Sequence, residues 1–561
     1  MPRLTADGGD GNNSTTKEAA TVGSGGLPGI VDAVVIGAGP NGLVGANALA
    51  DAGWDVLVLE AQDTIGGAVR SAEIVEPGYV TDLFSAFYPL AKASPVIRDL
   101  HLEEHGLVWR HAPSVVGHAF PDGRAAILHR AVEETAAGLE QEHPGDGEAW
   151  VELHRQWTAV RGPLLDALFT PFPPVRAMLS VLRTQRAAGL LDLTRLGLTP
   201  VRRLGTENFG GDGGPALLAG NAMHSDLPPD GAGSGFFGWL LCMLGQDVGF
   251  PVPEGGAGVL ADSLRRRAES RGAQFLTSSP VTAVTVRGGR AVGVEIAGGG
   301  SVRARRAVVA DVVAPALYRD LLPRDSVPAG LQRDLDRFEW DGGTIKVNWA
   351  LDTPVPWKAA GLSGAGTVHL GVDNDGLLEA AKDIALGRVP EHPFLLFGQM
   401  TTADPSRSPV GTESAWAYTH VPSGLDWQPD ALARHVDRMR ASVEEVAPGF
   451  GDHLVGEHVQ SPALLEEWDA NLVGGAINGG TSGLHQQLVL RPTPGLGRPE
   501  TPVEGLFLAS ASAHPGGGVH GACGWNAARA ALATQRPGRG LRRALVGTAW
   551  ERVLRDPRRS R

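Results

Sequence analysis

The sequence is poor in cysteine and has no long apolar run. Cys242 and Cys523 are the two cysteines among 561 residues, too few for a disulfide framework, and no CxxC pair offers a metal or dithiol site. The apolar stretch GFFGWLLCMLG in mid-chain is about half as long as the roughly 20 residues that a membrane-spanning helix needs. We therefore expect a protein of a reducing, cytoplasmic compartment with no bound metal and no spanning helix.

Positive charge is also scarce, since the net charge is −13 at pH 7. This balance argues against nucleic acid as a partner, because a general nucleic-acid binder needs a basic face. Basic residues gather in residues 536–561, a tail with nine arginines and two acidic residues. The tail predicts either peripheral contact with anionic lipid or a solvated end. Residues 1–28 are rich in Gly, Ser, Asn and Thr and lack the apolar segment of a secretory signal, so we expect a disordered leader.

The first ordered unit reads as strand, helix and strand. IVDAVVI, residues 30–36, is a continuous apolar run, as a buried parallel strand requires. The glycine-rich GAGPNG of residues 37–42 follows at once and opens a helical run that ends at Gly53. The next strand, WDVLVLE, ends at Glu60. This is the context in which a GxGxxG pattern predicts a dinucleotide site.

Each glycine of the pattern has its own predicted role. Gly37 permits the tight turn, Gly39 lets backbone approach a pyrophosphate, and Gly42 lets the helix pack on the sheet. The helix N-terminus offers free N–H groups to the phosphates. Glu60 can accept hydrogen bonds from both ribose hydroxyls and disfavours a 2′-phosphate, so FAD or NAD is expected and NADP is not.

A second glycine pair, Gly66 and Gly67, follows six residues after Glu60. We expect this pair to let backbone pass close to the pyrophosphate and Arg70 to supply a charge there. The arrangement resembles the dinucleotide signature of the flavin amine oxidase and phytoene desaturase superfamily, in which the ligand is FAD. No second GxGxxG unit appears in mid-chain, so a separate NAD(P)H domain is not expected.

The stretch SAHPGGGVHGACGWNAARAAL, residues 512–532, allows two interpretations. Cys523, between His520 and Asn526, has the setting of a thiol nucleophile, whereas the glycines indicate backbone pressed against a ligand. The stretch resembles the last strand, loop and helix of glutathione-reductase-like FAD folds, whose helix N-terminus faces the flavin pyrimidine. The resemblance implies a helix that begins at Val519 and His520, and it makes Cys523 a packing residue.

The chain also resembles the phytoene-dehydrogenase-related FAD oxidoreductases. The resemblance rests on DAVVIGAGPNGLVGANALADAGWDVLVLEAQDTIGGAVRSAEIVEPGY, LHLEEHGL, GGAGVLADSL, QQLVLRPTP and the C-terminal loop. Pro40 stands where many relatives have His, so any role of that His is lost. The resemblance implies an α/β fold: a Rossmann-type FAD-binding domain of the amine oxidase and phytoene desaturase type, with a mixed α+β substrate domain.

The predicted FAD contacts extend the two glycine loops to their neighbours. They comprise Gly37, Ala38, Gly39, Pro40, Asn41, Gly42, Glu60, Ala61, Gly66, Gly67, Arg70, Val281, Gly517, Gly518, Val519 and His520. We divide the chain into seven segments. They are a leader (1–28), three FAD-binding segments (29–93, 246–335 and 496–535), a helical substrate region (94–245), a substrate domain (336–495) and the basic tail (536–561).

Lys346 is one of only five lysines and lies in the apolar stretch GGTIKVNWALDTPVPW. In strand geometry Thr344, Lys346 and Asn348 share one face. The stretch resembles the strand of flavin amine oxidases whose Lys holds a water at flavin N5, which implies a catalytic role for Lys346. The alternative is an exposed or snorkelling lysine.

The pattern predicts an FAD-dependent dehydrogenase or desaturase that moves a hydride from a C–C or C–N bond to flavin N5. The resemblance implies a small apolar, isoprenoid or carotenoid-like substrate, with oxygen or a quinone as electron acceptor. Two alternatives remain: a flavin amine oxidase and a non-catalytic FAD-binding regulatory protein. GNAMHSDLPPDGAGSGFFGWLLCMLG, residues 220–245, predicts either a substrate tunnel or apolar core.

Overall fold

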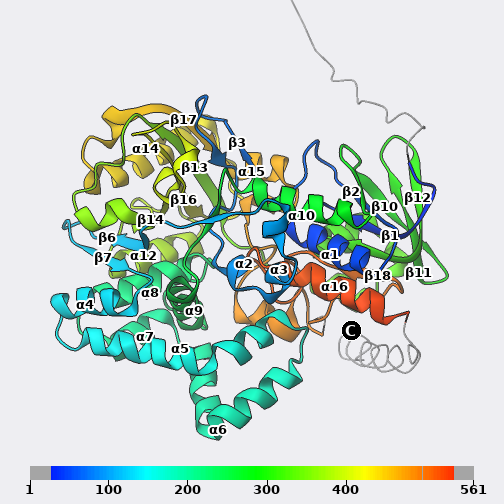
Figure 1. The fold of residues 1–561 in the computed structure, drawn as a ribbon, viewed down its shortest axis with the longest axis horizontal. Coiled ribbons are helices and arrows are strands. Elements are labelled where there is room, and N and C mark those ends of the chain that lie inside the picture. The colour runs from blue at the N-terminus through cyan, green and yellow to red at the C-terminus, as the bar shows by residue number, and fades with distance from the viewer. Residues whose placement is uncertain (1–26, 496, 536–561) are drawn as a thin grey trace, which may run out of the picture.

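The computed structural model describes residues 27–495 and 497–535. Two lobes lie side by side, each built around one large sheet (Figure 1). The leader and the basic tail lie almost wholly outside the described residues, so the predicted disorder and lipid contact stay predictions. No helix in the described part of the chain is long and apolar enough to cross a membrane.

The first sheet has parallel strands in the order β9-β2-β1-β12-β18, extended beyond β12 by the antiparallel β11 and β10. Its strands are β1 (Ile30–Ile36), β2 (Val56–Leu59), β9 (Gln274–Leu276), β10 (Val281–Arg287), β11 (Arg290–Ile296), β12 (Gly300–Ala310) and β18 (Leu506–Leu508). One face packs on α1 (Pro40–Asp51), α10 (Gly258–Ser270) and α16 (Ala522–Ala533). The sheet therefore assembles from three distant parts of the chain.

The second sheet has the order β17-β13-β16-β15-β14-β6-β7. Its strands are β6 (Ser114–Ala119), β7 (Ala125–Leu128), β13 (Gly343–Leu351), β14 (Ala365–Leu370), β15 (Leu395–Gln399), β16 (Glu413–Val421) and β17 (Leu454–Gln460). One face packs on α14 (Pro429–Val446), and the other faces α5 (Asp146–Phe169), α8 (Gly213–Met223) and α9 (Ser234–Asp247).

The description of residues 94–245 as helical missed three strands: β6, β7 and the two-residue β5 (Trp109–Arg110). These strands are short, and β6 is buried along its whole length, so it lacks the alternation that marks a half-exposed strand. The other helices are α2 (Pro89–Ala93), α3 (Pro95–Arg98), α4 (Val132–Glu142), α6 (Val175–Leu198), α7 (Val201–Asn208), α11 (Ala329–Leu335), α12 (Asn374–Ala385), α13 (Met400–Ala403) and α15 (Pro462–Trp468). The remaining strands are β3 (Ser71–Ala72), β4 (Thr81–Asp82), β5 (Trp109–Arg110) and β8 (Val252–Pro253).

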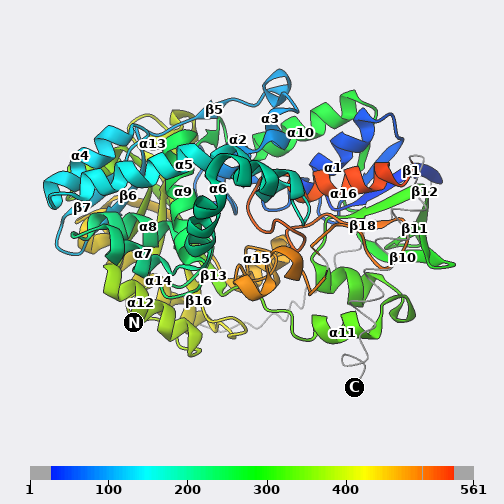
Figure 2. The ribbon, with the colours of Figure 1, turned by 90° about the horizontal axis from the view of Figure 1, so that it is seen from below.

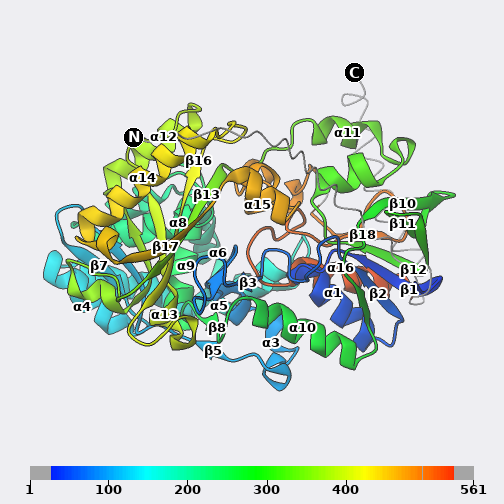
Figure 3. The same ribbon diagram turned by 90° about the horizontal axis from the view of Figure 1, so that it is seen from above.

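Helices and one buried ion pair join the lobes. Seen from below, α5 and α6 run across the junction (Figure 2), and from above α15 lies between the second sheet and the first lobe (Figure 3). Arg407, fully buried, binds both carboxylate oxygens of Asp82 at 3.0 and 3.1 Å and also pairs with Asp404 at 3.0 Å. This network holds β4 against the turn Pro405–Arg407, which precedes β16.

Candidate functional site

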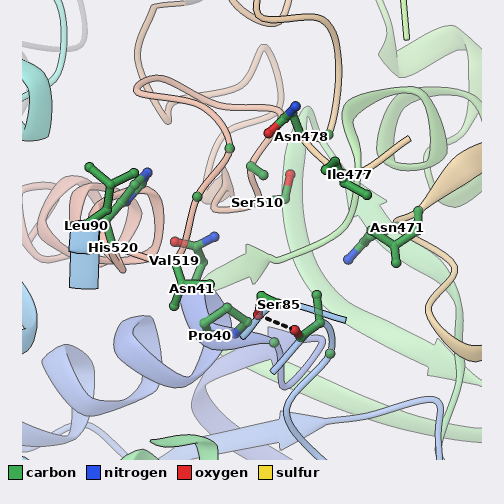
Figure 4. Close-up of a pocket in the computed structure, with 18 of the residues that line it drawn as sticks. Pro40, Asn41, Ser85, Leu90, Asn471, Ile477, Asn478, Ser510, Val519 and His520 are labelled. Carbon is green, nitrogen blue, oxygen red and sulfur yellow. Dashed lines mark hydrogen bonds between the residues drawn. The ribbon is translucent and has the colours of Figure 1, made fainter. Parts of the chain in front are cut away.

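A cavity of about 930 Å³ lies where the lobes meet. The predicted contacts that line it are Gly37, Gly39, Pro40, Asn41, Glu60, Ala61, Gly67, Val281, Lys346, Gly517, Gly518, Val519 and His520. Thus segments nearly 500 residues apart share one space, and the close-up shows Asn41 and Val519 beside each other (Figure 4). Ala38, Gly42, Gly66 and Arg70 lie behind this lining.

The N-terminal glycines pack on Asp311, at the end of β12. The Gly42 N–H donates to Asp311 Oδ2 at 2.7 Å. A Cβ on Gly39 would lie 2.8 Å from the same oxygen, and one on Gly42 would lie 2.1 Å from the Gly37 carbonyl oxygen. Glycine is therefore required at these positions by the protein itself, in addition to any need of a phosphate. Burial raises the pKa of Asp311 to about 8.

The Glu60 carboxylate closes the same loop. It accepts hydrogen bonds from the Ala38 N–H at 2.7 Å and the Gln62 N–H at 2.9 Å, and it lines the cavity. The carboxylate is thereby held at the carboxyl end of β2, where a ribose hydroxyl is expected in a dinucleotide site. Its contact with the ribose stays a prediction.

Gly66 and Gly67 bring the next turn onto the fingerprint loop. The Gly66 N–H donates to the Ala38 carbonyl at 2.9 Å, and a Cβ on Gly67 would lie 3.0 Å from the Gly39 Cα. Arg70 is not part of the cavity lining: its Nε donates to the Gly67 carbonyl at 2.9 Å and its guanidinium lies over the Phe84 ring. In this position Arg70 supports the turn through backbone carbonyls, and its proposed contact with the pyrophosphate stays a prediction.

The C-terminal helix begins at Ala522, so the expected start at Val519 and His520 is wrong. Gly521 has a φ of 70°, a left-handed conformation that interrupts the helix. His520 Nδ1 accepts a hydrogen bond from the Ala522 N–H at 3.0 Å. Burial lowers the pKa of His520 to about 4, so the ring is neutral and Nδ1 is free to accept. The glycine loop that leads into the helix still lines the cavity through Gly517, Gly518 and His520.

Two buried amide side chains have unpaired atoms at this cavity. Asn41 Oδ1 and Asn478 Nδ2 have no partner among the described residues, and both side chains line the cavity (Figure 4). An unpaired buried polar atom costs about 1–3 kcal/mol, so an acceptor and a donor are available to a polar ligand. Together with the helix N-termini of α1 and α16, this donor set fits a dinucleotide that carries a flavin.

Arg491 of the QQLVLRPTP motif holds the outer loop of the cavity. Its guanidinium is fully buried and donates to the backbone carbonyls of Asn478, Thr481 and Ala511 at 2.7–3.0 Å. Burial lowers its pKa. Arg491 and Asp311 both help to build the site, and neither is among the predicted contacts. For Asp311 the sequence held a usable signal, because this acid ends the apolar strand run VVAD.

Lys346 lies on the cavity wall together with Thr344, which shares its face of β13. Only 3% of its surface is exposed, so the exposed-lysine alternative is wrong. Its Nζ donates to the Asp82 carbonyl and to Asn348 Oδ1 and lies 5.7 Å from the centre of the Trp416 ring. Burial lowers the pKa of Lys346 to about 7, although nearby Asp82 opposes the shift. A buried amine that is partly neutral at pH 7 can accept a proton.

The opposite end of the cavity is apolar. Its side chains come mainly from α5, α6, α9 and the segment 484–488: Leu164, Leu168, Phe172, Leu193, Phe236, Phe237, Leu240, Leu241, Phe250, Leu484 and Leu488. Residues 220–245 are divided between the cavity and the core, because Phe236, Phe237 and Leu240 line the cavity while Trp239 and Met243 pack in the core. The substrate tunnel stays a prediction.

Cys523 is fully buried and does not line the cavity. Its Sγ lies 3.5 Å from the Ala513 carbonyl, and burial raises its pKa to about 12. We expect neither Cys523 nor the buried Cys242 to react with a thiol reagent in the folded protein, because the thiolate is the reactive form. Titration with and without denaturant checks this; a thiol that reacts rapidly in the native protein would restore the nucleophile interpretation.

Comparison with known proteins agrees with this geometry. Residues 41–532 match the family described as flavin containing amine oxidoreductase. The chain is 29% identical to pyridine nucleotide-disulfide oxidoreductase domain-containing protein 2 of Rattus norvegicus, over 89% of this chain and 92% of that one. It is 23% identical to a phytoene desaturase (neurosporene-forming) of Rhodobacter capsulatus, over 87% of this chain and 91% of that one.

Among solved structures, cyclohexylamine oxidase from Brevibacterium oxydans is similar in fold. Its TM-score is 0.56 at 19% identity, with 90% of this chain and 100% of that chain covered. Its likeness confirms the predicted fold class of a Rossmann-type FAD domain with a mixed substrate domain. The family match spans most of the chain, from Asn41 at the end of the first glycine loop through the C-terminal loop that lines the cavity. The chain therefore belongs to the flavin containing amine oxidoreductase family, and it is an FAD-dependent oxidoreductase.

Proposed function

We propose that the protein dehydrogenates an apolar, isoprenoid-like substrate. The observation that carries this proposal is the apolar end of the cavity. This end is formed by α5, α6 and α9 and is continuous with the part lined by the two glycine loops. Such a wall binds a hydrocarbon by removing its surface from water. The similarity to a phytoene desaturase supports the same substrate class. Bound FAD supplies the hydride acceptor, and oxygen or a quinone is the proposed final electron acceptor.

Lys346 is the proposed catalytic residue. Loss of a hydride and a proton from adjacent carbons forms a double bond, and the proton needs an acceptor. The neutral Nζ of Lys346 is a basic group of the wall whose pKa is lowered to about 7. Its contacts with the Asp82 carbonyl and Asn348 fix the position of the amine.

An amine oxidase is the second candidate. Trp416 and Tyr418 lie on the cavity wall as a stacked pair, 5.9 Å apart between ring centres, and aromatic faces attract cationic amines. The side chains from α5, α6 and α9 that form the rest of this wall are apolar, however, and burying a charged amine against them is costly. The apolar substrate is therefore preferred.

Anaerobic reduction of the bound flavin tests the choice. We expect the purified protein to be yellow and its oxidised-flavin absorbance to fall on addition of phytoene in detergent micelles. Cyclohexylamine serves as the matched amine probe, with micelles alone as the control. Reduction by the amine but not by the polyene would favour the oxidase. A flavin that neither probe nor a cell extract reduces would favour a non-catalytic role.

A further inference from the structure

His224 is a polar side chain at the apolar end of the cavity. It follows the last turn of α8, and its ring lines the cavity beside Phe250, with 6.1 Å between ring centres. Its Nε2 lies 2.9 Å from Nε2 of His369, a fully buried residue of β14. Among the described residues Nδ1 of His224 has no hydrogen-bond partner and remains accessible.

The surroundings decide which nitrogen of each ring holds the proton. Burial lowers the pKa of both His224 and His369 far below neutrality, so one neutral ring donates to the other. His369 Nδ1 is buried without a partner and packs against Gly220, where an added Cβ would lie 2.1 Å from it. Orphaned buried N–H groups are rarer than orphaned acceptors. His369 therefore keeps its proton on Nε2 and donates it to His224 Nε2.

The consequence is a fixed donor at the cavity. A neutral imidazole has one N–H, and since His224 Nε2 accepts from His369, its proton must be on Nδ1. A second polar group of the wall is the hydroxyl of Tyr418, which lies on the same strand, β16, as Trp416. A pure hydrocarbon would leave the His224 N–H unpaired on binding, at a cost that a ligand oxygen removes.

We propose that this cavity selects an apolar molecule carrying one hydrogen-bond-accepting oxygen, a hydroxyl, carbonyl or ether, which binds the Nδ1–H of His224. The proposal deepens the proposed function and rests on it only for the statement that the bound molecule is the substrate. His369 acts as a positioning residue because it sets the tautomer of His224.

Equilibrium binding to the FAD-loaded protein tests the proposal without turnover. The probes are farnesyl methyl ether, whose oxygen accepts but cannot donate, and the hydrocarbon in which a methylene replaces that oxygen. Protein fluorescence gives the affinity of each probe for the wild type and for each variant. The ratio of the two affinities is then compared between proteins, so the difference in hydrophobicity between the two probes cancels. We expect His224→Phe to lower the ether-to-hydrocarbon ratio about 10-fold.

Two amide variants separate the two nitrogens of the ring. The amide of His224→Asn lies near the Nδ1 position, so this protein should keep much of the preference for the ether. The amide of His224→Gln lies near the Nε2 position, keeps the contact with His369 and should lose the preference. An unchanged ratio in the Phe or Gln variant overturns the proposal. Flavin reduction by the hydrocarbon together with an unchanged ratio would leave the proposed function standing and remove this inference alone.

Discussion

Replacing Gly524 with alanine is expected to abolish stable FAD binding. Gly524 lies in the first turn of α16, against the first turn of α1. A Cβ at this position would lie 1.8 Å from the Asn41 carbonyl oxygen and 2.6 Å from its carbon. Backbone atoms cannot rotate away, so the two helices must separate. Overpacking of this kind costs about 1–3 kcal/mol or more.

The functional effect should exceed the loss of stability. The N-terminal ends of α1 and α16 carry the two loops that line the cavity, so their separation displaces both halves of the FAD site. A shift of about 1 Å can cost about 100-fold in function. We expect flavin content after gel filtration to fall at least tenfold, together with a lower melting temperature.

Gly45→Ala is the matched control, since it lies in the same helix pair. Its added Cβ would lie 3.4 Å from the Gly524 carbonyl oxygen, near ordinary contact distance, and alanine favours a helix by about 1 kcal/mol over glycine. This variant should keep its flavin. A Gly524→Ala protein that retains full flavin and the wild-type melting temperature would show that the helices do not need this contact.

The sequence predicts the N-terminal half of the FAD site well because the signals for this half are local. The spacing of Gly37, Gly39 and Gly42, and the acid that ends the next strand, are readable over about 30 residues. The second half was found by resemblance, although the helix start was misplaced by three residues. That error arose because a side chain, His520, and the left-handed Gly521 decide the start.

The groups that complete the site come together only through the fold. His224 and His369 are 145 residues apart, and Arg407 reaches Asp82 across 325 positions. No periodicity links such residues, because their pairing depends on how the second sheet and the helices pack. Lys346 was singled out by its rarity and its apolar neighbours, but its burial and its contact with the Asp82 carbonyl needed the structure.

Replacing Lys346 with methionine is expected to slow substrate-dependent flavin reduction by about 100-fold, within the range of general acid–base catalysis. The lowered pKa, about 7, gives the pH dependence its sign. The neutral amine accepts the proton, so the reduction rate of the wild type should rise as pH increases through about 7. Stopped-flow reduction across this range checks the inflection, which should be absent in the Lys346→Met protein.

Two further variants distinguish proton transfer from charge and from a general effect of substitution. Lys346→Arg keeps the positive charge but cannot lose its proton near pH 7, so it should be slow at every pH. Lys382→Met changes an exposed lysine whose side chain is 51% exposed and should match the wild type. A Lys346→Met protein with the wild-type rate and inflection would remove the catalytic role.

The same pKa shift predicts how stability depends on pH. The unfolded chain keeps the lysine proton up to its ordinary pKa of 10.5, whereas the folded chain loses it above about 7. Between these values the unfolded state binds more protons, so the free energy of unfolding should rise with pH. Denaturant titrations of the wild type should show this rise. In the Lys346→Met protein the free energy of unfolding should rise less steeply with pH, because the contribution of Lys346 is missing. Equal slopes in both proteins would mean that Lys346 is charged in the folded state, and the proposed proton acceptor would then be ruled out.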